Sequence, residues 1–328
     1  MSKILYLTIC LFIVQFSCDL NNSEEEDRGT LITSEINTSW LVLYWSRISE
    51  ELITGGTDGI QVIDIHTKMV RTLQDSSTFA MDLSNDGETI YYLEGMVLQG
   101  DVEPLHSISL NGQNKKLLTE NVYVDCFCLC PQKLNIAYKK GSIVDEDSVY
   151  IFNIQTKENK FLCNGIPMVF SPNGKDLICA TFMGGNSEYL IIDIENEDIT
   201  PLSLESLGID ENYHSFSVTF KWLDDGIYIL YSLGEPEIFY VHNYTVNENA
   251  SSWEIPPFGT MHFCWSDDAE KVAYWRWDGT YNNLFVVGTT GLKKIVKTEE
   301  YYIGNIAFSS DKTRIAYVIG SSIYMKNI

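Results

Sequence analysis

Short apolar segments alternate with small polar turns along most of this chain, and one such unit recurs. Its clearest copy, residues 167–179, is an apolar strand ending in Phe170, a Ser-Pro-Asn-Gly turn and a second apolar strand. Two further copies span 81–92 and 263–274. The apolar segments are rich in β-branched and aromatic residues, which favour strands, and no segment has the period of a helix. The pattern therefore predicts an all-β protein.

The residue before each turn, which we call the anchor, sets the length of the repeat. Successive anchors are 38 to 52 residues apart, and they are Trp45, Leu83, Leu129, Phe170, Trp222, Trp265 and Phe308. A four-stranded propeller blade takes about 40–45 residues, so the spacing predicts a single β-propeller. The turns after Trp45 and Trp222 depart most from the repeat, and the longest step holds an insertion around 204–217.

Seven anchors predict seven four-stranded blades, and six blades are the alternative if the first unit is a divergent lead-in. After the last anchor the chain supplies strands at 314–318 and 322–326 but no fourth strand. The segment 30–36 has strand character. We expect this N-terminal strand to complete the last blade and close the ring, because an open ring would leave unpaired strand edges.

The unit at Phe170 resembles the TolB-like and WD40-like propeller repeat, in which an aromatic residue precedes Ser-Pro-Asp-Gly-Lys and an apolar strand. Asn173 stands where the family usually has Asp, and the Trp-Asp dipeptide of true WD40 repeats is absent. The resemblance extends from about residue 40 to the C-terminus. It implies a fold rather than an activity, because the same repeat serves scaffolds, transport accessories and peptidase gating domains.

Residues 1–17 are typical of a secretory signal peptide, with an early lysine, an apolar run at 4–14 and small residues after it. The end of this segment resembles a bacterial lipobox, which implies a lipid on Cys18, although Gln15 stands where the family usually has an aliphatic residue. An ordinary signal peptide with an incidental Cys18 is the alternative. We expect an exported protein, lipid-anchored in the bacterial cell envelope.

Residues 18–29 are acidic and have no core-forming pattern, so they predict a flexible tether before a propeller domain at 30–328. The formal net charge of the chain is −23. Such a charge repels phosphate backbones, so nucleic acid is not an expected partner. It also disfavours anionic lipid surfaces, so membrane attachment is expected through the lipid anchor alone.

Six cysteines follow Cys18, and they are Cys126, Cys128, Cys130, Cys163, Cys179 and Cys264. The first three alternate along one strand and cannot bridge each other. We expect buried free thiols. The alternatives are a pairing of Cys163 or Cys179 with one of the first three, and a zinc cluster, although the Cys-x-x-Cys spacing of such clusters is missing.

Strand alternation assigns the loops to two faces of the ring. The turns after the anchors lie on what we call the bottom face, and the loops between second and third strands and between blades lie on the top face. The bottom turns carry Asp86, Asp225, Asp267, Asp268 and Asp311. Asp and Asn stabilise such turns by bonding nearby backbone, so we expect these acids to be structural.

The top loops hold aromatic residues beside carboxylates and amides, a mixture that suits a sugar or a basic peptide. The candidate ligand-binding residues are Trp275, Trp277, Asp278, Tyr281, Glu300, Tyr301, Tyr302 and His214. The structural alternative is that the two tryptophans continue a strand, with one packed into the next blade.

No Gly-x-Ser-x-Gly motif and no paired histidines are present, and we expect no cofactor and no metal. The favoured function is a non-catalytic propeller that binds a protein, peptide or glycan through its top face. The alternatives are a carbohydrate-active hydrolase or lyase that uses top-face carboxylates, and an accessory subunit of a TolB-like envelope transport complex. We expect a monomer or a part of such a complex.

Overall fold

The structure is a computed structural model, and its described residues are strands joined by turns. It describes residues 27–34, 42–95, 102–132, 134–140, 148–183, 186–203, 219–233, 238–243, 263–288, 291–300 and 303–328. No helix occurs within these ranges. The same residues therefore contain no helix of the length and hydropathy needed to cross a membrane.

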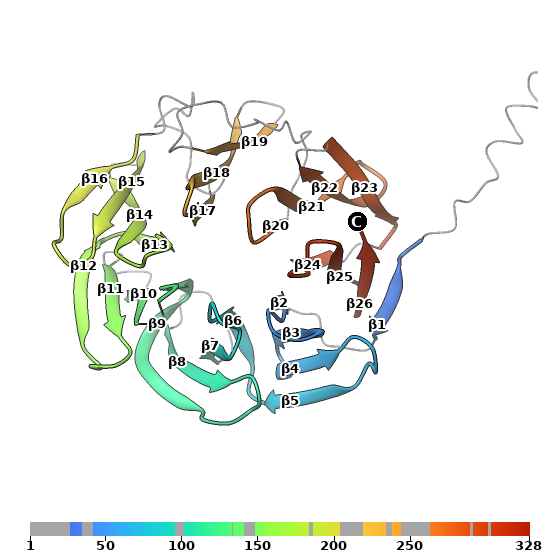
Figure 1. Ribbon diagram of the computed structural model, residues 1–328, viewed down its shortest axis with the longest axis horizontal. Helices are drawn as coiled ribbons and strands as arrows, with labels where there is room; N and C mark the ends of the chain where they lie inside the picture. The colour runs from blue at the N-terminus through green and yellow to red at the C-terminus, as the bar shows by residue number, and fades with distance from the viewer. Residues whose placement is uncertain are drawn as a thin grey trace, which may run out of the picture.

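Curled antiparallel sheets are arranged in a circle (Figure 1). One sheet contains β2 (Val42–Trp45), β3 (Glu51–Gly56), β4 (Gly59–Asp64) and β5 (Val70–Gln74). The next group contains β6 (Thr78–Leu83), β7 (Thr89–Glu94), β8 (Val102–Ser109), β9 (Lys116–Leu129), β10 (Asn135–Lys140), β11 (Ser148–Asn153) and β12 (Asn159–Asn164).

The remaining sheets continue the circle in chain order. They contain β13 (Ile166–Phe170), β14 (Asp176–Met183), β15 (Asn186–Asp193) and β16 (Ile199–Pro201); β17 (Thr219–Leu223), β18 (Gly226–Leu233) and β19 (Ile238–Asn243); and β20 (Phe263–Trp265), β21 (Lys271–Trp277), β22 (Asn282–Gly288) and β23 (Gly291–Thr298). The last sheet has the order β1 (Thr30–Thr33), β26 (Ser322–Asn327), β25 (Arg314–Ile319) and β24 (Ile303–Phe308). In the circle, β2, β6, β13, β17, β20 and β24 lie nearest the centre and β1 lies at the outside (Figure 1).

The long strand β9 belongs to two neighbouring groups of strands. Its first part pairs with β8, as Leu105 opposite Thr119 shows, and its last part pairs with β10, where Ala137 lies opposite Cys128. The seven strands from β6 to β12 therefore form one continuous hydrogen-bonded sheet. The strand nearest the N-terminus, β1, pairs with β26 near the C-terminus, with Leu31 opposite Tyr324.

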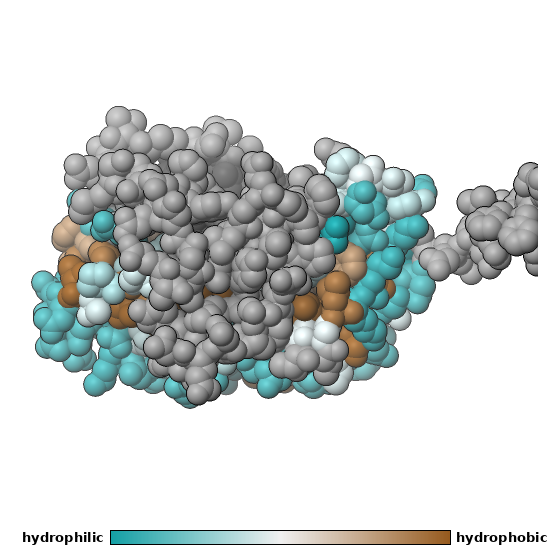
Figure 2. Space-filling view, turned by 90° about the horizontal axis from the view of Figure 1, so that it is seen from above, coloured by the Kyte–Doolittle hydropathy of each residue, from teal (hydrophilic) through white to brown (hydrophobic). Residues whose placement is uncertain are grey.

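The anchors mark the ends of the inner strands. Six of them are the last residue of their strand, and Trp222 is the last but one. Trp45, Phe170 and Phe308 are buried between neighbouring sheets, each in a separate apolar cluster. In the side view of the ring, hydrophobic residues of the described strands lie in a band at mid-height, with hydrophilic residues below it (Figure 2). The apolar clusters between sheets hold the ring together.

Candidate functional site

Four turns of the bottom face share one hydrogen-bonded design. The hydroxyl of Ser171 accepts a bond from the backbone N–H of Asp176 at 2.9 Å and donates to Asn173 at 2.8 Å. Asn173 accepts a further bond from the N–H of Lys175 at 2.9 Å. Gly174, between them, has φ +71°. A short polar side chain thus closes the turn from inside, as the composition of these turns predicts.

The same design holds most of the acids of this face in structural positions. Ser84, Ser266 and Ser309 repeat the contacts of Ser171, with the partners Asp86, Asp268 and Asp311. Asp225 accepts a bond from the hydroxyl of Tyr228 at 2.9 Å. The structural role predicted for these acids is confirmed for Asp86, Asp268 and Asp311, which also accept bonds from backbone N–H groups of their own turns. Asp267 differs, because its carboxylate points to side chains of other sheets.

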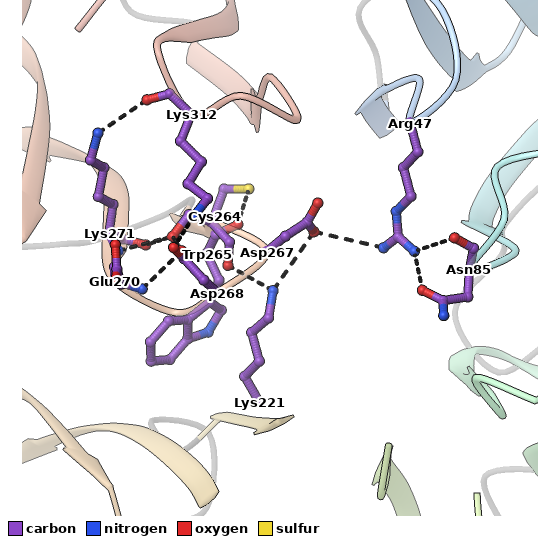
Figure 3. A network of polar contacts seen from close by, with 11 residues as sticks. Arg47, Asn85, Lys221, Cys264, Trp265, Asp267, Asp268, Glu270, Lys271 and Lys312 are labelled. Atoms are coloured by element: carbon purple, nitrogen blue, oxygen red, sulfur yellow. Dashed lines mark hydrogen bonds and ion pairs between the residues drawn. The ribbon is translucent and has the colours of Figure 1, made fainter. Parts of the chain in front are cut away.

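Asp267 lies between two cations near the ring axis, and we call Arg47, Lys221 and Asp267 the axial cluster (Figure 3). One carboxylate oxygen of Asp267 is 3.7 Å from Arg47 Nη2 and 4.0 Å from Lys221 Nζ. Arg47 comes from the turn between β2 and β3, Lys221 from β17, and Asp267 from the turn between β20 and β21. Three sheets that are separate along the chain therefore contribute to one cluster.

Burial shifts the proton affinities of groups around this cluster. It raises the pKa of Asp82, on the inner strand β6, to about 6, although the Leu83 N–H and the charge of Arg47 act in the opposite direction. Burial also raises the pKa of the Cys264 thiol to about 11 and lowers the pKa of Lys221. The inner strands thus place a carboxyl, a thiol and an amine where water is partly excluded.

The sequence prediction did not include Arg47 and Lys221, although a signal was present. The two turns that depart most from the repeat are the turn that contains Arg47 and the turn that follows Lys221. A turn that loses its Ser-Pro-Asn-Gly chemistry is a candidate for a role other than folding. That signal did not indicate that Asp267 is the partner of both cations, because the pattern of a repeat does not show which residues of different sheets come into contact.

On the top face, the two tryptophans of β21 take opposite positions. Trp275 is 0% exposed, and its indole N–H donates to the carbonyl of Gly304 at 3.1 Å. Trp277 is 56% exposed at the end of the strand. The structural alternative considered for the pair therefore holds for Trp275, whose ring is enclosed by protein and offers no face to a ligand.

Asp278 and Tyr281, which follow Trp277, are engaged in their own turn. The backbone N–H groups of Tyr281 and Thr280 donate to Asp278 at 2.9 and 3.0 Å, and Asn283 donates to its other oxygen at 2.9 Å. These hydrogen bonds hold the pKa of Asp278 below its usual range, and the bond from the Tyr281 N–H has the largest effect. Lys297 Nζ lies 3.6 Å from the centre of the Tyr281 ring, a cation–π contact.

Glu300 forms an ion pair with Arg28, at 3.6 Å, and its carbonyl accepts a bond from Asn282 at 2.9 Å. Of the other predicted site residues, Tyr301, Tyr302 and His214 lie outside the described residues, as does Cys18. The described part of the predicted top-face surface thus consists of exposed Trp277 and a rim of paired charges and turn residues.

The cysteines that the structure describes are free thiols. Cys130, Cys163 and Cys179 are buried, Cys128 and Cys264 are half-buried, and none of the five forms a disulfide. The prediction of buried free thiols is confirmed for Cys130, Cys163 and Cys179, whereas Cys128 and Cys264 are free but only half-buried. The alternative disulfide pairings are not formed among these five cysteines. Within the described ranges, no three His, Cys, Asp or Glu side chains are grouped so as to hold a metal ion.

No protein-family model and no curated protein matches the chain. Solved structures do. TolB from Acinetobacter baumannii is similar over 88% of this chain and 76% of its own, with a TM-score of 0.53 and 14% identity. The Swd1 β-propeller domain of Myceliophteria thermophila covers 90% of this chain and 98% of its own, with a TM-score of 0.60 and 14% identity.

An oligogalacturonate lyase in complex with manganese is similar over 91% of this chain and 83% of its own, with a TM-score of 0.56 and 10% identity. At these identities the similarities show the fold alone. The circle of curled sheets and these structural relatives agree, and the chain is a β-propeller protein with the TolB-like and WD40-like fold.

Proposed function

We propose that this protein is a non-catalytic β-propeller that binds a protein, peptide or glycan through its top face. The observation that carries the proposal is the side chain of Trp277, which ends β21 with a 56% exposed indole ring. A large exposed aromatic ring beside polar groups is typical of surfaces that bind sugars or peptides.

The position of the acids favours binding over the hydrolase or lyase alternative. A pair of catalytic carboxyls would converge on one pocket, and at least one of them would have a raised pKa. Among the described carboxyls, burial raises the pKa of Asp82 to about 6 and also raises that of Asp176. Asp82 is on β6 and Asp176 on β14, in different sheets. Neither acid is among the groups that shift the pKa of the other, so the two carboxyls do not behave as a converging catalytic pair.

We also propose a ring of seven blades closed by β1. The seven-stranded sheet counts as two blades that share β9, and the other five sheets count as one blade each. The pairing of Leu31 with Tyr324 supports closure by the N-terminal strand. The lipid on Cys18 and the place in the bacterial envelope are proposals that rest on the sequence of residues 1–29. An accessory role in an envelope transport complex is a proposal that rests on the resemblance of the unit around Phe170 to the TolB-like repeat.

The test of the binding proposal is a peptide and glycan array with the purified protein, followed by affinity measurements on the strongest hit. We expect Trp277→Ala to weaken binding about tenfold or more, because an aromatic anchor at the centre of a contact contributes about 2 kcal/mol. Trp277→Phe keeps a ring and is the matched control, with a smaller loss.

The melting temperature separates a binding role from a folding role. Trp277→Ala should keep it within about 2 °C of the original value, because little apolar area is lost from the core. An unchanged affinity in Trp277→Ala would place the ligand elsewhere on the molecule and remove the proposal.

A further inference from the structure

Within a chain of net charge −23, the axial cluster brings two cations to one carboxylate. Arg47 Nη2 and Lys221 Nζ approach the same oxygen of Asp267 from different sides (Figure 3). The side chains of Arg47 and Asp267 are exposed, at 37% and 57%, and that of Lys221 is partly buried, at 23%. The cluster is thus an accessible group of positive charge on a strongly acidic molecule.

Both cations are held in place by groups other than Asp267. Arg47 Nη1 donates to the side-chain oxygen of Asn85 at 2.8 Å and to its carbonyl at 3.2 Å. Lys221 Nζ donates to the carbonyl of Ser266 at 2.7 Å. These contacts orient both side chains before any ligand arrives, which reduces the entropy that binding would cost.

Asp267, in contrast, is loosely held by its partners. The separations of 3.7 and 4.0 Å are ion pairs but exceed the length of a hydrogen bond. An exposed pair of this kind contributes little to stability. The carboxylate of a ligand that accepts direct hydrogen bonds from both cations would be bound more strongly than the carboxylate of Asp267 is.

The neighbouring charges leave Arg47 and Lys221 as the available cations of the cluster. Lys312 is paired with Asp268, and Lys271 donates to the carbonyl of Lys312 at 3.0 Å. Arg314, on the same face, is paired with Glu50 at 2.8 Å. The charge of Arg47 also acts on the inner-strand carboxyl of Asp82, whose charged form is disfavoured by burial.

We propose that the axial cluster is a binding site for a carboxylate group, presented by a small organic acid or by an acidic peptide. Arg47 and Lys221 bind the carboxylate, and Asp267 is the internal group that occupies the site in the absence of a ligand. Guanidinium groups match the planar geometry of carboxylates. The site is on the bottom face and does not rest on the function proposed for Trp277.

The test is a calorimetric titration of the purified protein with two probes, succinate and a short peptide rich in Asp and Glu, at low ionic strength. Asp267→Asn removes the internal competitor, so we expect it to strengthen binding about threefold to tenfold. Arg47→Gln and Lys221→Met each remove one cation and should weaken binding about tenfold. Lys297→Met, a cation of the top face, is the matched control and should change nothing.

The pattern across the variants decides the outcome. Binding of either probe that follows this pattern supports the site, and the probe that binds identifies the source of the carboxylate. Affinities that do not respond to Arg47→Gln and Lys221→Met would overturn the proposal. The proposal would also be overturned if neither probe bound to the original protein or to Asp267→Asn. This variant should fold normally, because the side chain of Asp267 is exposed. A lower melting temperature of Asp267→Asn without binding would assign the cluster a purely structural role.

Discussion

At the scale of single residues, the inner strands of this propeller hold ionisable groups in partly dry surroundings. Asp82 is the clearest case, because burial raises the pKa of its carboxyl to about 6 while the Leu83 N–H, at 2.7 Å, and the charge of Arg47 only partly compensate. A carboxyl with a raised pKa in the folded state favours folding when protonated. Its contribution is full below the unfolded-state pKa, near 4, and is lost as the pH rises through about 6.

Replacement of this carboxyl should therefore change the pH dependence of stability. We expect Asp82→Asn to raise the free energy of unfolding by about 1–3 kcal/mol at pH 7.5 and by little at pH 4, where Asp82 is already protonated. The amide oxygen of Asn can still accept the bond from Leu83. Urea unfolding at both pH values measures the difference, and an equal effect at the two would show that charge at Asp82 is not the cause.

At the scale of one element, β21 shows how a strand serves the core and the surface at once. Successive side chains of a strand point to opposite sheet faces, so Trp275 and Trp277 share a face. They differ because Trp275 is enclosed by residues of the neighbouring sheet, whereas Trp277 is 56% exposed. Trp275 packs edge-on against Tyr317, with ring centres 5.9 Å apart, in a cluster that includes Ile303 and Ile315.

The two tryptophans should therefore respond differently to the same substitution. Trp275→Ala should lower the free energy of unfolding by about 3–5 kcal/mol, since it leaves a cavity and removes the bond to Gly304. Trp277→Ala should lower it by less than about 1 kcal/mol. Denaturant unfolding of both variants under the same conditions measures this difference. Similar losses of unfolding free energy in the two variants would contradict the conclusion that Trp275 is in the core and Trp277 is not.

At the scale of the whole molecule, the ring depends on contacts between segments that are far apart in the chain. Ile32 of β1 is 2% exposed and packs in a cluster with Leu43, Val318 and Ile323. The hydroxyl of Tyr317 donates to the carbonyl of Arg28 at 2.6 Å. A ring whose first and last strands are paired has no open edge at that position, which protects it against pairing with other chains.

If β1 locks the ring, its buried and exposed faces should contribute unequally. We expect Ile32→Ala to lower the free energy of unfolding by about 2–4 kcal/mol, because it empties part of an apolar cluster. Leu31→Ala, which changes a 40% exposed side chain of the same strand, is the control and should cost less than about 1 kcal/mol. Equal midpoints of urea unfolding for Ile32→Ala and the original protein would show that β1 does not contribute to closure.

Much of the architecture followed from local chemistry. The turn signals placed the anchors Phe170, Trp265 and Phe308 at strand ends, where the structure has them. The Asp and Asn residues of these turns were predicted to be structural, and Asn173 and Asp268 close their turns as expected. Such features are readable because a turn is specified by four or five consecutive residues and by the hydrogen bonds they make to each other.

The sequence by itself determined the all-β propeller class, the repeat and the chemistry of the turns, because these depend on neighbours in the chain. Only the tertiary structure decided that Trp275 is core and Trp277 surface, since this depends on which side chains of the next sheet pack against the strand. It alone brought Arg47 to Asp267 and Lys221, which are far apart in the chain. Their contact depends on the curvature of the whole ring, which no local pattern of residues specifies.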